Sequence, residues 1–209
     1  SREPDILSLY DVEEGYYKEI LGYNNILEMA NDFVQKYKQM IDSIDKYDGF
    51  YIGRYELTGT LENPKEKAGK VLDVETAGNW YNLYNACEKI VDTDYAKSMM
   101  IYGCQWDETC SWLEKNGYNT TSDSSSWGNY NSSSLIETGT NNQFKANNIY
   151  DFAGNYWEWT QEANSTNNRV DRGGRYDLLG SKYPAADRGI LEPSNTFHSG
   201  TTRAVLYVI

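Results

Sequence analysis

The ten residues 151–160, DFAGNYWEWT, are the most informative stretch of this chain. Going outward from them, three more segments stand out. On the N-terminal side are residues 49–58, GFYIGRYELT, and residues 105–108, QWDE; on the C-terminal side is the run RGGRY at 172–176, which leads to RAVL at 203–206. The pattern of residues 50–58 predicts a strand, and the apolar run at 204–208 predicts a buried strand.

Taken in their order along the chain, these four segments resemble the formylglycine-generating-enzyme family, also called sulfatase-modifying factors. The resemblance spans about residues 48–209, and its most specific part is Asp-x-x-Gly-Asn-x-Trp-Glu-Trp at 151–159. It implies an α+β fold of the C-type-lectin type, with a small twisted antiparallel sheet, two flanking helices and long irregular loops. One departure is Thr201-Thr202-Arg203, where relatives usually have Gly-Phe-Arg.

Helical periodicity appears in three places. Apolar residues recur at steps of three and four from Ile26 to Ile44, after Asn25, which predicts an N-capped helix that ends at Asp48-Gly49. The spacing of Trp80, Cys87 and Ile90 predicts a second helix, and that of Trp106, Cys110 and Leu113 a third, so Cys87 and Cys110 are expected in the core. We therefore divide the chain into an N-terminal helical segment, 1–47, which packs on the domain or on another subunit, and a lectin-like domain, 48–209.

Composition excludes several classes of function. The chain has 209 residues and a net charge of −12, whereas binding to nucleic-acid phosphates needs a basic face. The apolar run 204–209 is far shorter than the roughly 20 residues that a membrane-spanning helix needs. A single histidine excludes a histidine-rich zinc or iron site within one chain. Long Asn- and Ser-rich stretches between 116 and 148 predict irregular structure around Trp127 and Tyr130.

The activity of the family depends on residues that this chain lacks. Family members that oxidise a substrate cysteine bind copper through a cysteine pair in the tail, and iron-dependent relatives use several histidines. Residues 172–209 contain no cysteine, and the one histidine is His198. We therefore expect no enzymatic activity and no catalytic cofactor.

The tail predicts a contact surface instead. Three triplets of mixed chemistry, at 177–179, 189–191 and 197–199, lie in a frame of Gly, Pro, Ser, Tyr and Arg. This arrangement resembles the variable region of proteins diversified by diversity-generating retroelements, and all nine residues are types that any-any-pyrimidine codons encode. Lys182 and Glu192 lie outside the triplets. We assign the variable region to 172–209, and the predicted ligand-binding residues are Arg175, Asp177, Leu178, Leu179, Ser181, Asp187, Gly189, Ile190, Leu191, Phe197, His198 and Ser199.

The resemblance also implies a structural calcium ion. In calcium-binding members, oxygen ligands come from the segment around the Gly-Asn-x-Trp-Glu core; here these are the side chains of Asp151 and Glu158 and the carbonyls of Gly154 and Tyr156. Such a set suits Ca²⁺. The alternative is that Asp151 is a turn residue and Glu158 pairs with an arginine such as Arg172. Asp107 and Glu108 are expected to be charges on a helix surface.

The resulting hypothesis is a non-catalytic, receptor-like or adhesin-like protein that displays a diversified surface to a protein ligand. Its expected location is a phage or virus particle or a cell surface, with oligomerisation through the N-terminal helix as an option. Two alternatives remain: an inert structural component of a virion or cell surface, assembled through residues 24–45, and an active oxidase of the formylglycine-generating type.

Overall fold

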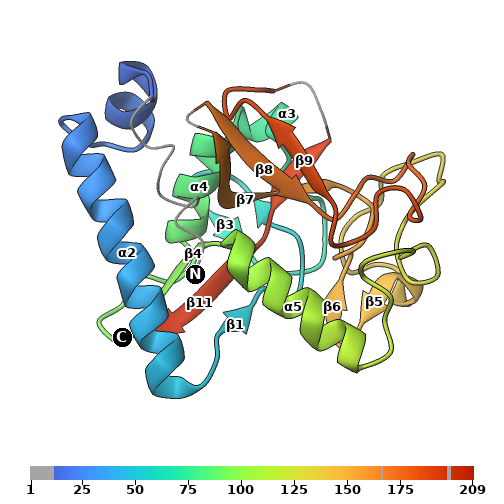
Figure 1. Cartoon of the computed structure of the whole chain (residues 1–209). Helices are drawn as coiled ribbons and strands as arrows, with labels where there is room; N and C mark the ends of the chain where they lie inside the picture. Colours follow the sequence, from blue (N-terminus) through green and yellow to red (C-terminus); the bar gives the residue numbers. More distant parts are fainter. Residues whose placement is uncertain (1–11, 166, 197–198) are drawn as a thin grey trace.

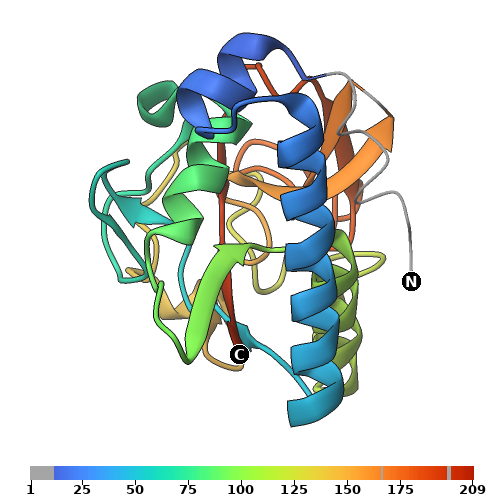
Figure 2. The same cartoon turned by 90° about the vertical axis from the view of Figure 1, so that its left-hand side faces the viewer.

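The computed structural model describes residues 12–165, 167–196 and 199–209 (Figure 1). Within them the chain is a mixed α/β structure with small sheets, a few helices and long loops. The helices at 26–47 and 103–115 contain all the residues whose spacing predicted them. The long N-terminal helix, 26–47, lies along one side of the molecule (Figure 2). The helices are η2 (Gly15–Ile20), α2 (Ile26–Tyr47), α3 (Val74–Ala77), α4 (Trp80–Glu88), α5 (Gly103–Lys115) and η3 (Asn142–Phe144).

The strands form two main sheets and two small ribbons. One sheet has the order β1-β11-β4 and is antiparallel; the other has the order β10-β7-β8-β9, in which β10 pairs with β7 in parallel. The strands are β1 (Tyr51–Ile52), β2 (Thr58–Gly59), β3 (Pro64–Lys65), β4 (Ala96–Met100), β5 (Lys145–Ala146), β6 (Ile149–Tyr150), β7 (Trp157–Ser165), β8 (Asn168–Arg172), β9 (Arg188–Leu191), β10 (Gly200–Thr202) and β11 (Ala204–Val208).

Local sequence explains the ends of α2. The Asn25 side chain accepts a hydrogen bond from the Glu28 N–H at 2.9 Å, which satisfies one of the unpaired donors of the first turn. At the other end Asp48 has φ 59°, a left-handed conformation that ends the helix and that Asp tolerates better than most residues. Both ends agree with the sequence prediction.

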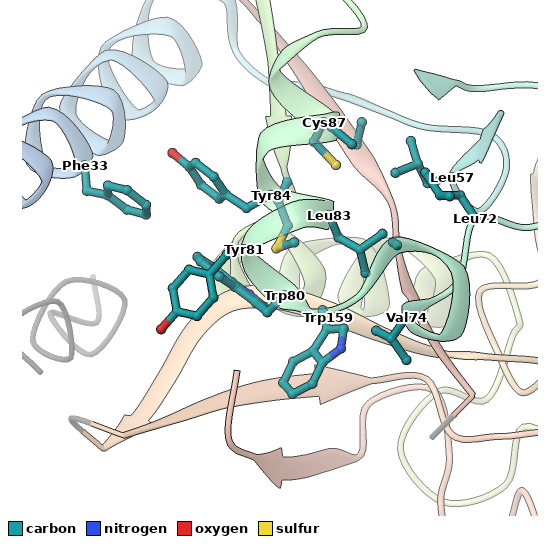
Figure 3. Close-up of a cluster of buried hydrophobic side chains, with 14 of the residues drawn as sticks. Phe33, Leu57, Leu72, Val74, Trp80, Tyr81, Leu83, Tyr84, Cys87 and Trp159 are labelled. Carbon is teal, nitrogen blue, oxygen red and sulfur yellow. The ribbon is translucent and has the colours of Figure 1, made fainter. Parts of the chain in front are cut away.

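The first hydrophobic cluster joins α2 to α4 and β7. Figure 3 shows Phe33 facing Tyr84, with ring centroids 4.7 Å apart, and Trp80 beneath them. The Trp80 indole donates to the Thr160 carbonyl at 2.8 Å, so this buried N–H is satisfied. Cys87 is buried here, as predicted. Because α2 contributes Phe33 to this cluster, the long helix packs against the rest of the chain.

The second cluster lies between α5 and β11. Trp106 stacks on Phe152 with centroids 3.9 Å apart, and Cys110 is buried beside them, as the spacing predicted. The predicted strand at 50–58 is shorter than expected: β1 and β2 form its ends, and the residues between them bend. The bend turns the Glu56 side chain into the interior, where it is completely buried.

Thr201 and Thr202, which stand where the resembled family usually has Gly-Phe, are buried in β10. The Thr201 hydroxyl donates to the Leu72 carbonyl at 2.7 Å, and the Thr202 hydroxyl donates to the Trp159 carbonyl at 2.8 Å. Each buried hydroxyl therefore has a partner, and the departure costs no unsatisfied polar group.

No helix in the part of the chain that the structure describes has the length and apolar character that a bilayer crossing requires.

Candidate binding surface

The segment between β8 and β9 lies against another irregular segment, residues 119–134, at the right of Figure 1. We call residues 175–187 the 175–187 loop. Backbone hydrogen bonds join the two segments, and since they involve only main-chain atoms they do not depend on which side chains the loop carries. The bonds are Asn131 N–H to Leu178 O, 2.8 Å; Ser132 N–H to Tyr176 O, 2.8 Å; Ser124 N–H to Gly180 O, 3.2 Å; and Ala186 N–H to Thr120 O, 2.8 Å.

Side chains in the middle of the 175–187 loop, from Asp177 to Ser181, alternate in exposure. Asp177, Leu179 and Ser181 are exposed, whereas Leu178 is half-buried and Gly180 is buried. Leu179 keeps 54% of its surface accessible, which is high for a leucine. Between residues 177 and 181 the loop therefore points every second side chain to solvent while its main chain stays bonded to the neighbouring segment, and Lys182 is exposed as well.

Arg175 and Asp177 contact each other at the start of the loop. The Arg175 Nε lies 2.6 Å from Asp177 Oδ1, and its Nη2 lies 2.9 Å from Oδ2. This is a two-point ion pair at the surface, so these two predicted contact residues present a joint polar patch.

Buried groups anchor the base of the loop. The Tyr130 hydroxyl donates to the Gly173 carbonyl at 2.5 Å, and the Trp106 indole donates to the Ala185 carbonyl at 2.9 Å. Gly174 has φ 77°, and a Cβ there would lie 2.4 Å from the Tyr183 carbonyl oxygen. The Arg-Gly-Gly run is thus a steric requirement of this turn.

β9 continues the surface as the edge strand of its sheet. Ile190, opposite Val170 of β8, keeps 50% of its surface exposed. Its neighbours Gly189 and Leu191, also predicted contact residues, are half-buried. Leu191 packs against the first hydrophobic cluster, and a Cβ on Gly189 would lie 1.9 Å from Oδ1 of the buried Asp171. Of the second triplet, the structure exposes only Ile190.

An ion-pair network holds β9 against α5. Arg188 Nη2 lies 2.6 Å from Asp107 Oδ2 and its Nε lies 3.0 Å from Glu162 Oε1, while the buried Arg172 contacts the same Asp107 at 2.6 Å. Asp107 is a charge on the surface of α5, as predicted, with 39% of its side chain accessible, and in addition it joins two arginines. Arg188 was missed because only the tertiary structure brings residue 188 to residue 107.

The remaining predicted contact residues are less accessible or not described. Asp187 is half-buried, and burial raises its pKa. Ser199 is half-buried, and its carbonyl accepts a hydrogen bond from the Trp157 N–H at 2.9 Å. Phe197 and His198 lie outside the described residues.

The segment predicted to bind calcium surrounds a buried guanidinium. Arg203 Nη2 and Nε lie 2.6 and 3.0 Å from the two carboxylate oxygens of Glu158, so Glu158 pairs with Arg203 and not with Arg172. Asp151, at φ 55°, accepts hydrogen bonds from the Thr138 hydroxyl and the Gly139 N–H, both at 2.9 Å. This agrees with the alternative in which Asp151 is a turn residue.

One of the two carboxylates predicted to bind calcium, Glu158, is already paired with an arginine. In the described residues no group of three or more His, Cys, Asp or Glu side chains is placed to hold a metal ion. Calcium binding therefore stays a prediction from the resemblance alone.

We call Arg203, Glu158, Glu56 and Glu66 the Arg203 centre. Glu56 accepts from the Asn155 amide at 2.7 Å, and Glu66 accepts from the Ala204 N–H at 3.0 Å. Burial raises the pKa of Glu56 well above its usual value and that of Glu66 to about 8. Burial disfavours the charged form of Arg203, but the neighbouring Glu158 carboxylate stabilises that charge more strongly. The pKa of Arg203 is therefore raised. The centre is structural in character, because Arg203, Glu158 and Glu56 are almost completely buried.

The sequence matches no protein-family model and no curated protein sequence. Among solved structures, the chain is similar to "Crystal Structure of CarF", with 16% identity and a TM-score of 0.42, over 54% of this chain and 48% of that one. It is also similar to "Treponema denticola variable protein 1", with 16% identity and a TM-score of 0.41, over 91% of this chain and 68% of that one. The chain thus spans about half the length of the first of these. Similarities this distant carry no argument about function.

Proposed function

We propose that this protein is a non-catalytic binding protein on a scaffold of the C-type-lectin type, and that its contact surface consists of the 175–187 loop and the outer face of β9. One observation carries the proposal: the loop is held by main-chain hydrogen bonds while Asp177, Leu179 and Ser181 point to solvent. Side chains in such a position can change without loss of the bonds that hold the backbone.

The exposed chemistry favours a protein ligand. Leu179 and Ile190 are two large apolar side chains on a surface that also carries the Arg175–Asp177 ion pair. Apolar contacts surrounded by polar groups are typical of protein–protein interfaces. A sugar site would more often show an aromatic plane next to fixed carboxylates, and neither Leu179 nor Ile190 provides one.

The thiol chemistry supports a role without catalysis. Oxidases of the resembled family need a cysteine pair in the tail, and residues 172–209 have none. Burial raises the pKa of Cys87 well above its usual value and that of Cys110 to about 12, so neither forms the reactive thiolate at neutral pH.

Diversification of the tail is the finer part of the proposal. Of the predicted contact residues that the structure describes, Asp177, Leu179, Ser181 and Ile190 are the exposed ones, so these four positions are the ones proposed to vary. Sequence variation at these positions would let the protein bind different partner proteins. For this reason we propose that the protein is located on a virus particle or a cell surface.

The proposal is tested with two display libraries. The first randomises Asp177, Leu179, Ser181 and Ile190; the matched control randomises Gly174, Ala185, Gly189 and Thr202, which are buried or close to other atoms. We expect most members of the first library to resist protease like the parent and some to bind immobilised hen lysozyme, whereas most of the control library unfolds. Equal loss of folding in both libraries contradicts the proposal.

A further inference from the structure

A second feature of the surface lies where α2 ends and β1 begins, at the bottom of Figure 1. A hollow of about 380 Å³ is enclosed by the α2–β1 connection on one side and by α5 on the other. This volume is within the range of small-ligand sites. Its lining residues are Asp48, Gly49, Phe50, Ile52, Glu108, Thr109 and Trp112.

The lining combines aromatic rings with acidic groups. Glu108 and Trp112 are four residues apart on α5 and therefore share one face of the helix. Asp48 is exposed on the opposite wall, and the last carbonyls of α2 add the partial negative charge of a helix C-terminus. The lining contains two carboxylates and no basic residue.

A groove extends the hollow along the edge of a sheet. A second depression, of about 610 Å³, continues past Ile52 and Trp112 toward Asn147. Its one basic lining residue, Arg54, has its guanidinium over the Tyr150 ring at 5.4 Å. β1 is an edge strand here, since among the described residues its one strand neighbour is β11. An extended peptide can add to such an edge by main-chain hydrogen bonds. Neither hollow is lined by a residue of the 175–187 loop.

We propose that this groove binds an extended segment of a basic partner protein, with an arginine side chain of that segment in the hollow between Trp112, Asp48 and Glu108. Arginine fits because its guanidinium stacks on an indole face, pairs with carboxylates at two points, and carries an aliphatic stem that packs on Phe50 and Ile52. Charge complementarity excludes a second copy as the favoured occupant, because the chain carries a net charge of −12. The site gives the protein a constant attachment point, independent of the surface proposed to vary.

Tryptophan fluorescence can test this directly. Trp112 is 44% exposed, whereas the other five tryptophans of the chain are each less than one-tenth exposed, so acrylamide quenching reports mainly on this site. The probe is acetyl-Thr-Val-Arg-Val-Thr-amide, and its control carries citrulline, the uncharged isostere, in place of arginine. We expect the arginine peptide to protect Trp112 from quenching and the citrulline peptide to bind about tenfold more weakly, the effect of losing one charged hydrogen-bonded pair.

Two protein variants complete the experiment. Asp48→Asn combined with Glu108→Gln removes both charges from exposed positions, and Asn keeps the left-handed conformation of residue 48. We expect this variant to bind the arginine peptide about tenfold more weakly, with an unchanged melting temperature. Equal binding of both peptides, equal binding by the variant, or no protection up to about 10 mM peptide overturns the proposal. A dimer in sedimentation that Trp112→Ala abolishes overturns it in favour of a second copy.

Discussion

The Arg203 centre and the 175–187 loop are organised in opposite ways. At the centre, a buried side chain holds the surrounding chain: Arg203 is fully buried, pairs with Glu158 and donates to the Gly53 and Tyr150 carbonyls, each at 2.9 Å. In the loop, main-chain hydrogen bonds to residues 119–134 hold the segment, and the Arg175–Asp177 ion pair joins two side chains at the surface. The difference indicates which substitutions each region tolerates, because a region held by its side chains cannot vary and a region held by its backbone can.

The largest effect is expected from Arg203→Met. Removing the guanidinium leaves Glu158 without its counter-charge in a buried site and leaves two carbonyls without a donor. We expect the free energy of unfolding to fall by about 3–5 kcal/mol in urea titrations. Arg175→Ala, which breaks a surface ion pair, is the matched control and is expected to cost less than about 1 kcal/mol. Similar costs for the two variants would remove the distinction between the regions.

A smaller effect is expected from Gly189→Ala. The added methyl group meets Oδ1 of the buried Asp171, which must move, so the free energy of unfolding is expected to fall by about 1–3 kcal/mol. Ile190→Ala changes the adjacent, exposed position and serves as the control in the same urea titrations. If both variants match the parent, β9 is freer to vary than its packing indicates.

The pH dependence of stability should follow the Arg203 centre. Burial raises the pKa of Glu66 from about 4.5 in the unfolded chain to about 8 in the folded one, so the folded state holds its proton over a range where the unfolded state has lost it. This contribution to stability is therefore complete below pH 4.5 and is lost as the pH rises to about 8. We expect Glu66→Gln to flatten the decline in unfolding free energy between pH 5 and 8. The exposed Glu62→Gln control should keep the parental slope.

The smallest effect is expected from Leu179→Ser. Leu179 is exposed in a loop whose main chain is bonded to residues 119–134, so the free energy of unfolding should change by no more than about 0.5 kcal/mol. Hydrogen exchange of the Asn131 amide, which donates to the Leu178 carbonyl, gives a local readout. Faster exchange at Asn131 in the variant would show that the side chain helps to hold the loop.

Much of the local structure was predictable because the responsible signals are close in sequence. Asn25 and Asp48 mark the ends of α2, and apolar spacing placed Cys87 and Cys110 in the core. The strand prediction at 50–58 was only partly right. The residue pattern predicted one continuous strand. In the structure the chain bends between β1 and β2, where Glu56 contacts Asn155, 99 residues away.

The contact surface was predictable as a region but not residue by residue. The tail triplets pointed to 177–179 and 189–191, yet exposure in the structure selects Asp177, Leu179 and Ile190 and leaves Gly189 and Leu191 half-buried. Which residue of an irregular loop faces outward depends on the segment beneath it, and no periodicity encodes that partner.

By itself, the sequence determined the three long helices, both ends of α2 and the central apolar strand at 204–208, because each depends on residue types at short spacing. Only the tertiary structure decided that Arg203 is the partner of Glu158, that residues 119–134 support the 175–187 loop, and that Asp48 and Trp112 line one hollow. These pairings depend on how distant segments pack. Which charged residue lies beside a buried carboxylate is set by the three-dimensional arrangement and not by distance along the chain.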